Sequence, residues 1–363
     1  MTAGKKFILT AGGTGGHVFP AEALADELVA KGCSVSFITD KRGNTFSGRF
    51  PTAREYRVFA SGYAGKGLFA KMKGLFYLGL GVLQSLMILK REKPDAVVGF
   101  GGYAAFPAGF AATLLKIPLV LHDQNAVLGG ANRFLAAKSA LIATSFPAVA
   151  RIPEKTATVF TGLPLRPDIL ALADAPYPPL NPPYTILITG GSQGAKIFGS
   201  VIPEALKLLP LDLKQKLKIQ QQCRAAELEA VKEAYKDSGL DVEVASFFSD
   251  MPERLKSAHL FICRAGASSI AETSIAGRPA IIVPMLSSAD GHQRANALSL
   301  AATGGAWMIE EPDFTPETLA GKIQELFNDP KTLITASEKI RERNRPDAAG
   351  LLAKAVLSVT ENG

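Results

Sequence analysis

The sequence is poor in cysteine and histidine, the side chains that build disulfide frameworks and metal sites. Its 363 residues include three cysteines and four histidines, and Cys33, Cys223 and Cys263 lie far apart without a C-x-x-C pair. This pattern argues against a disulfide scaffold and a zinc site. The apolar run 7–10 near the N-terminus is too short for a signal-peptide core. A reduced, cytoplasmic protein without a bound metal or cofactor is expected.

The sequence also lacks an apolar run of about 20 residues, the length that a membrane-spanning helix needs. The uncharged run 74–89 has 16 residues and contains three glycines. Residues 67–76 interleave large apolar and basic side chains, which suits the surface of an anionic bilayer. The candidate membrane patch consists of Leu68, Phe69, Lys71, Lys73, Leu75 and Phe76. The competing interpretation is a core helix with a solvated basic end, and this fits 82–89 better.

Acidic residues are scarce in the first half of the chain. Up to Leu163 there are 19 basic residues against 9 acidic ones, whereas from Pro164 onward there are 21 against 24. A basic half predicts an anionic partner, and nucleic acid, a membrane surface and a phosphorylated substrate all qualify. The basic half has no aromatic-rich surface motif on which bases could stack, which argues against a nucleic-acid partner.

Short apolar β-rich runs alternate with helical stretches, which predicts parallel sheets covered by helices. The expected strands are 7–10, 35–39, 96–100, 119–122 and 141–144 in the first half, and 185–189, 217–220, 242–245, 260–263 and 280–283 in the second. Seven prolines between Pro164 and Pro183 predict a linker. The expected organisation is an α/β protein with domains at 1–163 and 184–340, a linker at 164–183, and a C-terminal helix at 341–363 that packs back on the first domain.

Two glycine loops open the two halves in the same way. The strand 7–10 runs into Gly-Gly-Thr-Gly-Gly at 12–16, and 178 residues later the strand 185–189 runs into Gly-Gly-Ser-Gln-Gly at 190–194. A glycine loop at a helix N-terminus suits phosphate, although such loops are often only tight turns. No Walker lysine follows either loop, and neither matches the dinucleotide fingerprint, so a nucleotide triphosphatase or a nicotinamide enzyme is disfavoured.

Polar side chains cluster where the expected strands of the first half end. His17 closes the first glycine loop at the start of a helix, where a neutral imidazole can accept a proton. Asp123 and Asn125 follow the strand 119–122. Ligands of doubly wound sheets bind beyond these strand ends, so two facing domains would hold a substrate in a cleft between them.

The second half carries a constellation that suits a nucleotide sugar. After the strand 260–263, Ala267, Ser268 and Ser269 begin a helix whose N–H groups could receive a diphosphate. Glu272 lies one turn further on, where it could accept hydrogen bonds from a ribose, and Gln293 opens a later helix. This mixture of carboxylate, amide and backbone donors recognises a sugar without a nucleophile.

Six motifs in this order resemble the MurG family, the N-acetylglucosaminyltransferases that convert lipid I to lipid II in peptidoglycan synthesis. They are GGTGGH at 12–17, FGGY at 100–103, HDQN at 122–125, GGSQGA at 190–195, CRAGASS-x-x-E at 263–272 and DGHQ-x-x-NA at 290–297. The resemblance implies a GT-B fold of two Rossmann-like domains, inversion at the sugar, no required metal, and peripheral attachment to the cytoplasmic face of the inner membrane. The family has a glutamate where this chain has Asp123.

The resemblance also implies residue roles. UDP-N-acetylglucosamine would lie mainly on the second domain, and lipid I would reach the first from an anionic membrane surface. His17 would be the base, with Asp123 as the second candidate. The remaining expected substrate-binding residues are Thr14, Gly15, Gly16, Asn125, Arg166, Ser192, Phe248, Ala267, Ser268, Ser269, Glu272 and Gln293. The alternatives are another GT-B glycolipid glycosyltransferase, a UDP-sugar epimerase and a non-catalytic nucleic-acid binder.

Overall fold

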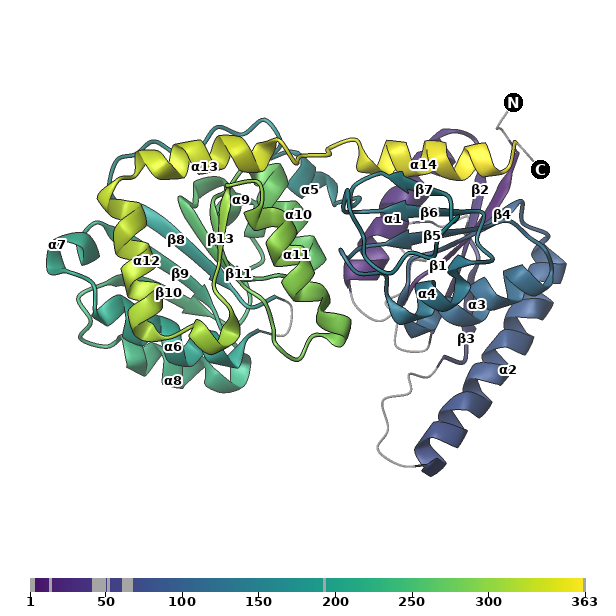
Figure 1. The fold of residues 1–363 in the computed structure, drawn as a ribbon, viewed down its shortest axis with the longest axis horizontal. Coiled ribbons are helices and arrows are strands. Elements are labelled where there is room, and N and C mark those ends of the chain that lie inside the picture. The colour runs from purple at the N-terminus through teal and green to yellow at the C-terminus, as the bar shows by residue number, and fades with distance from the viewer. Residues whose placement is uncertain are drawn as a thin grey trace. The chain divides into compact units, whose positions relative to one another are not determined.

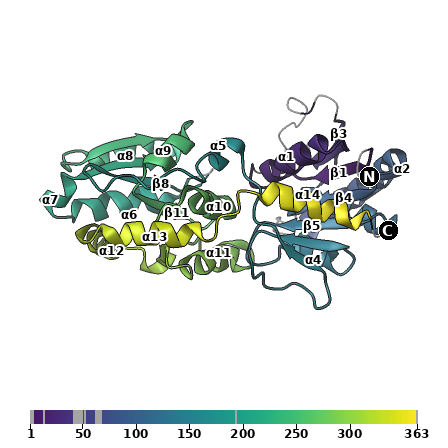
Figure 2. The same cartoon turned by 90° about the horizontal axis from the view of Figure 1, so that it is seen from above.

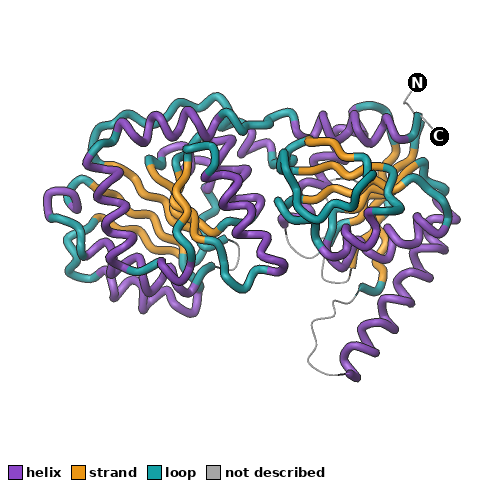
Figure 3. The backbone as a smooth tube through the Cα atoms, viewed as in Figure 1, coloured by secondary structure: helices purple, strands orange, loops and turns teal. Residues whose placement is uncertain are grey.

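The computed structural model describes residues 4–12, 15–40, 50, 53–60, 68–191 and 194–361. Contacts divide the chain into two compact units, Met1–Arg166 together with Arg345–Gly363, and Pro167–Asn344. Each unit is a parallel sheet covered by helices, as Figure 1 and Figure 3 show. The predicted α/β class with two doubly wound domains is confirmed.

The described part of the first unit contains a seven-stranded sheet in the order β3-β2-β1-β4-β5-β6-β7. Its strands are β1 (Lys6–Thr10), β2 (Ser34–Asp40), β3 (Glu55–Val58), β4 (Ala96–Gly99), β5 (Leu119–Asp123), β6 (Leu141–Thr144) and β7 (Thr158–Phe160). Its helices are α1 (Gly15–Ala30), α2 (Leu68–Glu92), α3 (Gly102–Leu114), α4 (Gly130–Ala136) and α14 (Ala348–Val359). All neighbouring strands are parallel, so their carboxyl ends meet at one edge.

Two hydrophobic clusters bury the two faces of this sheet. Phe7 and Leu9 of β1 pack on the side of α1 and α14, whereas Ile8 faces the side of α3 and α4. Strands buried on both faces are apolar at nearly every position, which is why the sequence shows them clearly. Leu352 and Val356 of α14 are fully buried in the first cluster, so the end of the chain completes this core (Figure 2).

The described part of the second unit contains a six-stranded sheet in the order β10-β9-β8-β11-β12-β13. Its strands are β8 (Tyr184–Thr189), β9 (Leu217–Gln222), β10 (Asp241–Ala245), β11 (Leu260–Arg264), β12 (Ala280–Val283) and β13 (Ala306–Met308). Its α-helices are α5 (Pro167–Leu170), α6 (Lys196–Lys207), α7 (Leu211–Lys214), α8 (Leu228–Tyr235), α9 (Met251–Ser257), α10 (Ala267–Ala276), α11 (His292–Ala301), α12 (Pro316–Asn328) and α13 (Lys331–Arg341). Short 3₁₀ turns are η1 (Ala225–Glu227), η2 (Ala289–Gly291) and η3 (Glu311–Asp313).

The proline-rich segment 164–183 packs against the second unit from Pro167 onward. Ile169 of α5 is fully buried, and Arg341 donates to the carbonyl oxygen of Ala173 at 2.6 Å. Arg278, itself fully buried, donates to the carbonyl oxygen of Pro176 at 3.1 Å. Prolines prevent regular structure but leave their carbonyl groups free to accept hydrogen bonds. Most of the segment predicted as a linker is therefore an ordered part of the second unit.

Candidate functional site

His17 lies in the first turn of α1, directly after the first glycine loop. Its Nδ1 donates a hydrogen bond of 2.7 Å to the carbonyl oxygen of Phe100, which follows β4. A carbonyl oxygen can only accept, so Nδ1 carries the ring proton and Nε2 keeps its lone pair. Burial lowers the pKa of His17, and the bond to Phe100 and the charge of Asp123 offset only part of this effect. His17 is therefore neutral near pH 7, with Nε2 as its basic nitrogen.

A glycine pair passes beside this nitrogen. Gly101 and Gly102 have φ angles of 83° and 71°, where side chains other than glycine are strained. A Cβ atom at Gly102 would lie 3.5 Å from Nε2 of His17. The two glycines let the chain turn sharply after β4 and add no side-chain atom beside the imidazole. The FGGY motif thus shapes the surroundings of His17.

Asp123, the last residue of β5, uses both carboxylate oxygens to hold the following loop. Its Oδ1 accepts from the N–H of Asn125 at 3.0 Å, and its Oδ2 accepts from the N–H of Gly129 and from Nδ2 of Asn132, both at 2.9 Å. Burial raises the pKa of Asp123, and these bonds offset part of the rise. The Asp123 carboxylate therefore holds the 123–132 loop in place through these hydrogen bonds.

Gln124 and His122 extend this network and were not among the predicted site residues. Nε2 of Gln124 donates at 3.2 Å to the same Phe100 carbonyl oxygen that accepts from His17. His122 is fully buried, with its Nε2 3.4 Å from the carbonyl oxygen of Gly162, and burial lowers its pKa to about 4. The sequence shows that a polar residue stands at the end of this apolar strand, but it does not show the contacts of His122.

In the second unit, α10 begins at the carboxyl edge of the sheet, directly after β11. Its N-cap is Gly266 in extended conformation, and no side chain among the described residues caps the helix. The first N–H groups of a helix have no partner within it, and the helix dipole adds positive potential there. The helix starts with Ala267, Ser268 and Ser269, whose small side chains leave these N–H groups approachable. An anionic group can bind at this terminus.

Neighbouring side chains brace this helix start. Asn296 of α11 is fully buried, and its Nδ2 donates to the carbonyl oxygen of Ala265 at 3.0 Å. Arg264 donates to Oε2 of Glu311 at 2.7 Å and to the carbonyl oxygen of Val283 at 3.2 Å. The arginine of the CRAG sequence is thus engaged in an ion pair across the carboxyl ends of β11 and β12.

The remaining predicted donor residues lie on several elements of the second unit. Glu272 is half-buried in α10, and Oε1 of Gln293 in α11 accepts from the N–H of Met285 at 2.9 Å. The glycine at 190 is needed because a Cβ atom there would lie 2.2 Å from the backbone nitrogen of Ala195. Phe248 lies in the loop after β10, and its ring is buried.

Some predicted residues can be placed only in part. Thr14 and Ser192 lie outside the described residues. Gly15 and Gly16 are the first residues of α1, ahead of His17. Arg166 belongs to the first unit, where its guanidinium lies 5.1 Å from the ring centre of Phe19. Among the described residues, no group of three or more His, Cys, Asp or Glu side chains could hold a metal ion.

Comparison with known proteins gives the family. The chain matches the N-terminal domain of glycosyltransferase family 28 over residues 7–144 and the C-terminal domain over residues 185–352. A protein of Rhodospirillum rubrum is 46% identical over 98% of this chain and 92% of its own length. A protein of Paramagnetospirillum magneticum is 47% identical over 98% of this chain and 96% of its own length. Both are named UDP-N-acetylglucosamine--N-acetylmuramyl-(pentapeptide) pyrophosphoryl-undecaprenol N-acetylglucosamine transferase. The chain belongs to the MurG family.

Solved structures agree with this assignment. The crystal structure of Acinetobacter baumannii MurG is 33% identical, covers 99% of this chain and all of its own, and has a TM-score of 0.77. A UDP-GlcNAc 2-epimerase from Neisseria meningitidis shares the fold at 13% identity and a TM-score of 0.66. The MurG family assignment and the GT-B fold predicted from the sequence are both confirmed, and the protein is a glycosyltransferase.

The predicted membrane patch of this MurG family member lies on α2. The segment Met72–Glu92 is long and apolar enough to cross a membrane by length and composition, and its most apolar 18-residue stretch has a mean hydropathy of 1.5. However, Leu78 and Leu89 are buried, and Oε1 of Gln84 accepts from the N–H of Phe59 at 2.9 Å. One side of α2 is therefore packed on the first unit.

The other side of α2 is exposed. Lys73 is exposed, and Leu75 and Phe76 are 58% and 64% exposed. Leu83 and Met87 continue this exposed row into 82–89, where the sequence had favoured a core helix; only the opposite side of that segment is core. Leu68, Phe69 and Lys71 belong to the predicted patch, but their side chains lie outside the described part of the chain.

Proposed function

We propose that the protein transfers N-acetylglucosamine from UDP-N-acetylglucosamine to the 4-hydroxyl of the N-acetylmuramoyl sugar of lipid I, undecaprenyl-diphospho-N-acetylmuramoyl-pentapeptide. The products are lipid II and UDP, and the anomeric carbon is inverted. The observation that carries the proposal is the full-length similarity to transferases named for this reaction. The neutral His17 at the carboxyl edge of the first sheet and the uncapped start of α10 supply the two functions that the reaction needs.

The first need is a base for the acceptor hydroxyl. As the hydroxyl oxygen bonds to the anomeric carbon, its proton passes to Nε2 of His17, and the bond from that carbon to the UDP oxygen breaks with its electron pair. His17 suits this role because Nδ1 is fixed by Phe100 and a lowered pKa keeps Nε2 unprotonated at pH 7. Asp123 is the weaker candidate because its oxygens already accept three hydrogen bonds.

The second need is stabilisation of the departing diphosphate. The N–H groups at the start of α10 would receive its negative charge without a metal ion. Glu272 would accept from the ribose hydroxyls, Gln293 and Asn125 would contact the sugar, and the Phe248 backbone would bind uracil. The other assigned contacts are Arg166 and Ser192 to the donor, and Thr14, Gly15 and Gly16 near the diphosphates.

A lipid-linked acceptor requires access to a bilayer surface, and we assign this role to the exposed side of α2. Lys73 there is flanked by Leu75 and Phe76, which are largely exposed. Phe106, Phe110 and Phe134 of α3 and α4 form a further aromatic cluster, and Phe134 is 65% exposed. Apolar side chains beside basic ones bind anionic bilayers peripherally. The proposed location is the cytoplasmic face of the inner membrane.

The test is an assay with purified protein, UDP-N-acetylglucosamine and lipid I in anionic vesicles. Formation of lipid II with stoichiometric UDP supports the proposal. A second arm offers diacylglycerol as the acceptor, and a third offers the nucleotide sugar alone. Transfer to diacylglycerol in preference to lipid I would indicate another glycolipid glycosyltransferase, and epimerised UDP-sugar in the third arm would indicate an epimerase. Either result overturns the assigned acceptor.

A further inference from the structure

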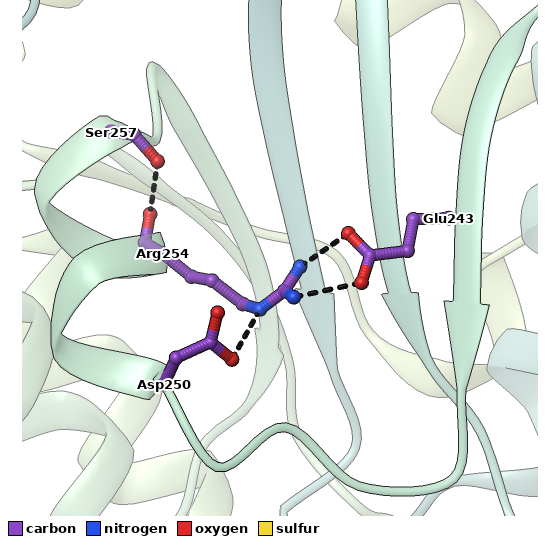
Figure 4. A network of polar contacts seen from close by, with 4 residues as sticks. All are labelled: Glu243, Asp250, Arg254 and Ser257. Carbon is purple, nitrogen blue, oxygen red and sulfur yellow. Dashed lines mark hydrogen bonds and ion pairs between the residues drawn. The ribbon is translucent and has the colours of Figure 1, made fainter.

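One arginine ties together the two ends of the loop that follows β10. Nη1 and Nη2 of Arg254, in α9, donate to the two carboxylate oxygens of Glu243, in β10, at 2.6 and 2.7 Å (Figure 4). Its Nε donates to Oδ1 of Asp250, the N-cap of α9, at 2.8 Å. The bidentate fork has the geometry of a strong, directional ion pair. The guanidinium thus fixes the end of the strand to the start of the helix.

The same guanidinium also covers the middle of the loop. Its central carbon lies 3.8 Å from the ring centre of Phe248, close enough for a strong cation–π contact. Phe248 is 5% exposed, whereas the adjacent Phe247 is 74% exposed. Among the described residues, no backbone hydrogen bond involves the N–H or C=O of Phe248. The loop therefore holds its aromatic side chain firmly, and within the described part of the chain the N–H and C=O of Phe248 have no backbone partner.

The ion pairs of Arg254 differ from an ordinary surface ion pair, because the arginine is largely buried while its two carboxylate partners are exposed. The Arg254 side chain is 12% exposed, whereas those of Glu243 and Asp250 are both 46% exposed. The arginine is covered by the loop that it holds, and its carboxylate partners reach water. Removal of the arginine would leave two solvated carboxylates and an unheld loop, rather than a buried unpaired charge. Its loss should consequently affect the order of the loop more than the folding of the unit.

We propose that Arg254 is a positioning residue for nucleobase recognition, which fixes the backbone N–H and C=O of Phe248 so that they pair with uracil and not with cytosine. This inference rests on the proposed UDP-sugar donor. Uracil presents an imide N–H beside a carbonyl oxygen, which a C=O and an N–H at fixed positions can match. Cytosine presents an unprotonated ring nitrogen beside an amino group, the reverse order. The N–H and C=O of Phe248 distinguish the two bases only if the backbone holds both groups in place.

The experiment compares UDP with CDP, which differ only in the base, by calorimetric titration of the full-length protein. The variants are Arg254→Met, which removes the fork and the charge, and Arg254→Lys, which keeps the charge without the planar fork. Glu243→Gln weakens one arm of the fork. Lys232→Met, which breaks the exposed pair with Glu229 in α8, is the matched control. Thermal unfolding of each variant shows whether it is folded.

Arg254→Met should weaken UDP binding about tenfold with little change for CDP, because the loop must then be ordered during binding. The UDP affinity of Arg254→Lys should resemble that of Arg254→Met. The UDP affinity of Glu243→Gln should lie between those of these variants and of the parent protein, and Lys232→Met should leave the UDP affinity unchanged. Equal weakening for UDP and CDP, or an unchanged UDP-to-CDP ratio in folded Arg254→Met, overturns the positioning role alone. A parent protein that does not prefer UDP overturns the donor assignment itself.

Discussion

At the scale of single residues, the two candidate bases differ in how much of their hydrogen-bonding capacity the protein already uses. His17 directs its protonated nitrogen at the Phe100 carbonyl oxygen and keeps Nε2 unprotonated. Asp123 accepts three hydrogen bonds from its own loop. The loop held by Asp123 contains Asn125, whose backbone N–H is one of the three donors. Asp123 thus fits the positioning of a binding loop better than proton transfer.

His17→Ala should lower kcat by about 10²–10⁴, the usual loss for a positioned general base, with little change in the donor KM. The active form is the neutral imidazole, so kcat of the parent protein should fall with decreasing pH. Because burial lowers the pKa of His17, this fall should be centred below 6.5. The measurement is the pH profile of kcat, in which the acidic limb should be absent from the variant. Recovery of activity by His17→Gln would instead indicate that His17 only orients the acceptor.

Asp123→Asn should reduce kcat and stability together while the acidic limb of the pH profile remains. The amide keeps one acceptor oxygen but places an NH₂ group either against the N–H of Asn125 or against both the N–H of Gly129 and the Nδ2 of Asn132. An unsatisfied buried donor costs about 1–3 kcal/mol, which should appear in the free energy of unfolding. A folded variant of unchanged stability with no turnover would return Asp123 to the role of base.

The sequence predicts these two side chains but cannot distinguish their roles. The sequence predicts His17 and Asp123 at strand ends because each directly follows an apolar strand or its glycine loop. The three donors to Asp123 come from positions 125, 129 and 132, and they converge only when the loop after β5 folds back into α4. Gln124 was overlooked for the same reason, since its partner lies 24 residues away at Phe100.

At the scale of elements, the start of α10 provides a positive potential that any negative side chain would compete for. Ala267→Asp places a carboxylate in the first turn, where it stabilises the helix by about 0.3–1 kcal/mol. The same charge should repel the donor diphosphate and occupy its N–H groups. We expect a small rise in melting temperature together with a marked loss of UDP affinity. Stability and ligand affinity therefore move in opposite directions.

Ala267→Asn is the matched control, because it has nearly the same shape without the charge. It should lower UDP affinity much less than Ala267→Asp does, and high salt should narrow the gap between the two variants. The measurements are calorimetric titration with UDP and thermal unfolding. Equal affinity of the two variants would show that the diphosphate binds away from this terminus.

The elements that the sequence missed are short strands at the outer edges of the sheets. All ten predicted strands are present, with bounds that differ by at most two residues. Most of them are buried on both faces and continuously apolar, whereas β10, at an edge of its sheet, is only partly buried. The missed strands, β3, β7 and β13, are three or four residues long and only partly buried. Their pairing depends on the neighbouring strand rather than on their own composition.

At the scale of the whole molecule, the uneven charge of the chain agrees with a division of work between its two halves. The half up to Leu163 carries an excess of ten basic residues, whereas the rest has a small acidic excess. The structure adds what the net charge cannot show, namely that basic and large apolar side chains share the exposed side of α2. Basic charge and large apolar side chains both favour binding to an anionic bilayer, whereas only the basic charge would favour binding of a soluble anionic ligand.

The triple variant Lys73→Glu, Leu75→Ser, Phe76→Ser should release the protein from anionic vesicles. Each basic residue near such a surface contributes about 1 kcal/mol, and each buried large apolar side chain about 1.5–3 kcal/mol, so affinity should fall about 100-fold or more. Vesicle co-sedimentation measures the loss.

The control is Lys207→Glu, Leu208→Ser, Leu211→Ser in the second unit, which changes charge and apolar surface in the same way at residues of comparable exposure. The control should stay bound, and both variants should keep activity on a water-soluble lipid I analogue. Because Lys73→Glu reduces the electrostatic attraction of the patch, added salt should weaken the vesicle binding of the parent and the control more than the remaining binding of the α2 variant. Undiminished vesicle binding by the α2 variant would assign the membrane contact to another surface, of which the aromatic cluster of Phe106, Phe110 and Phe134 is the next to test.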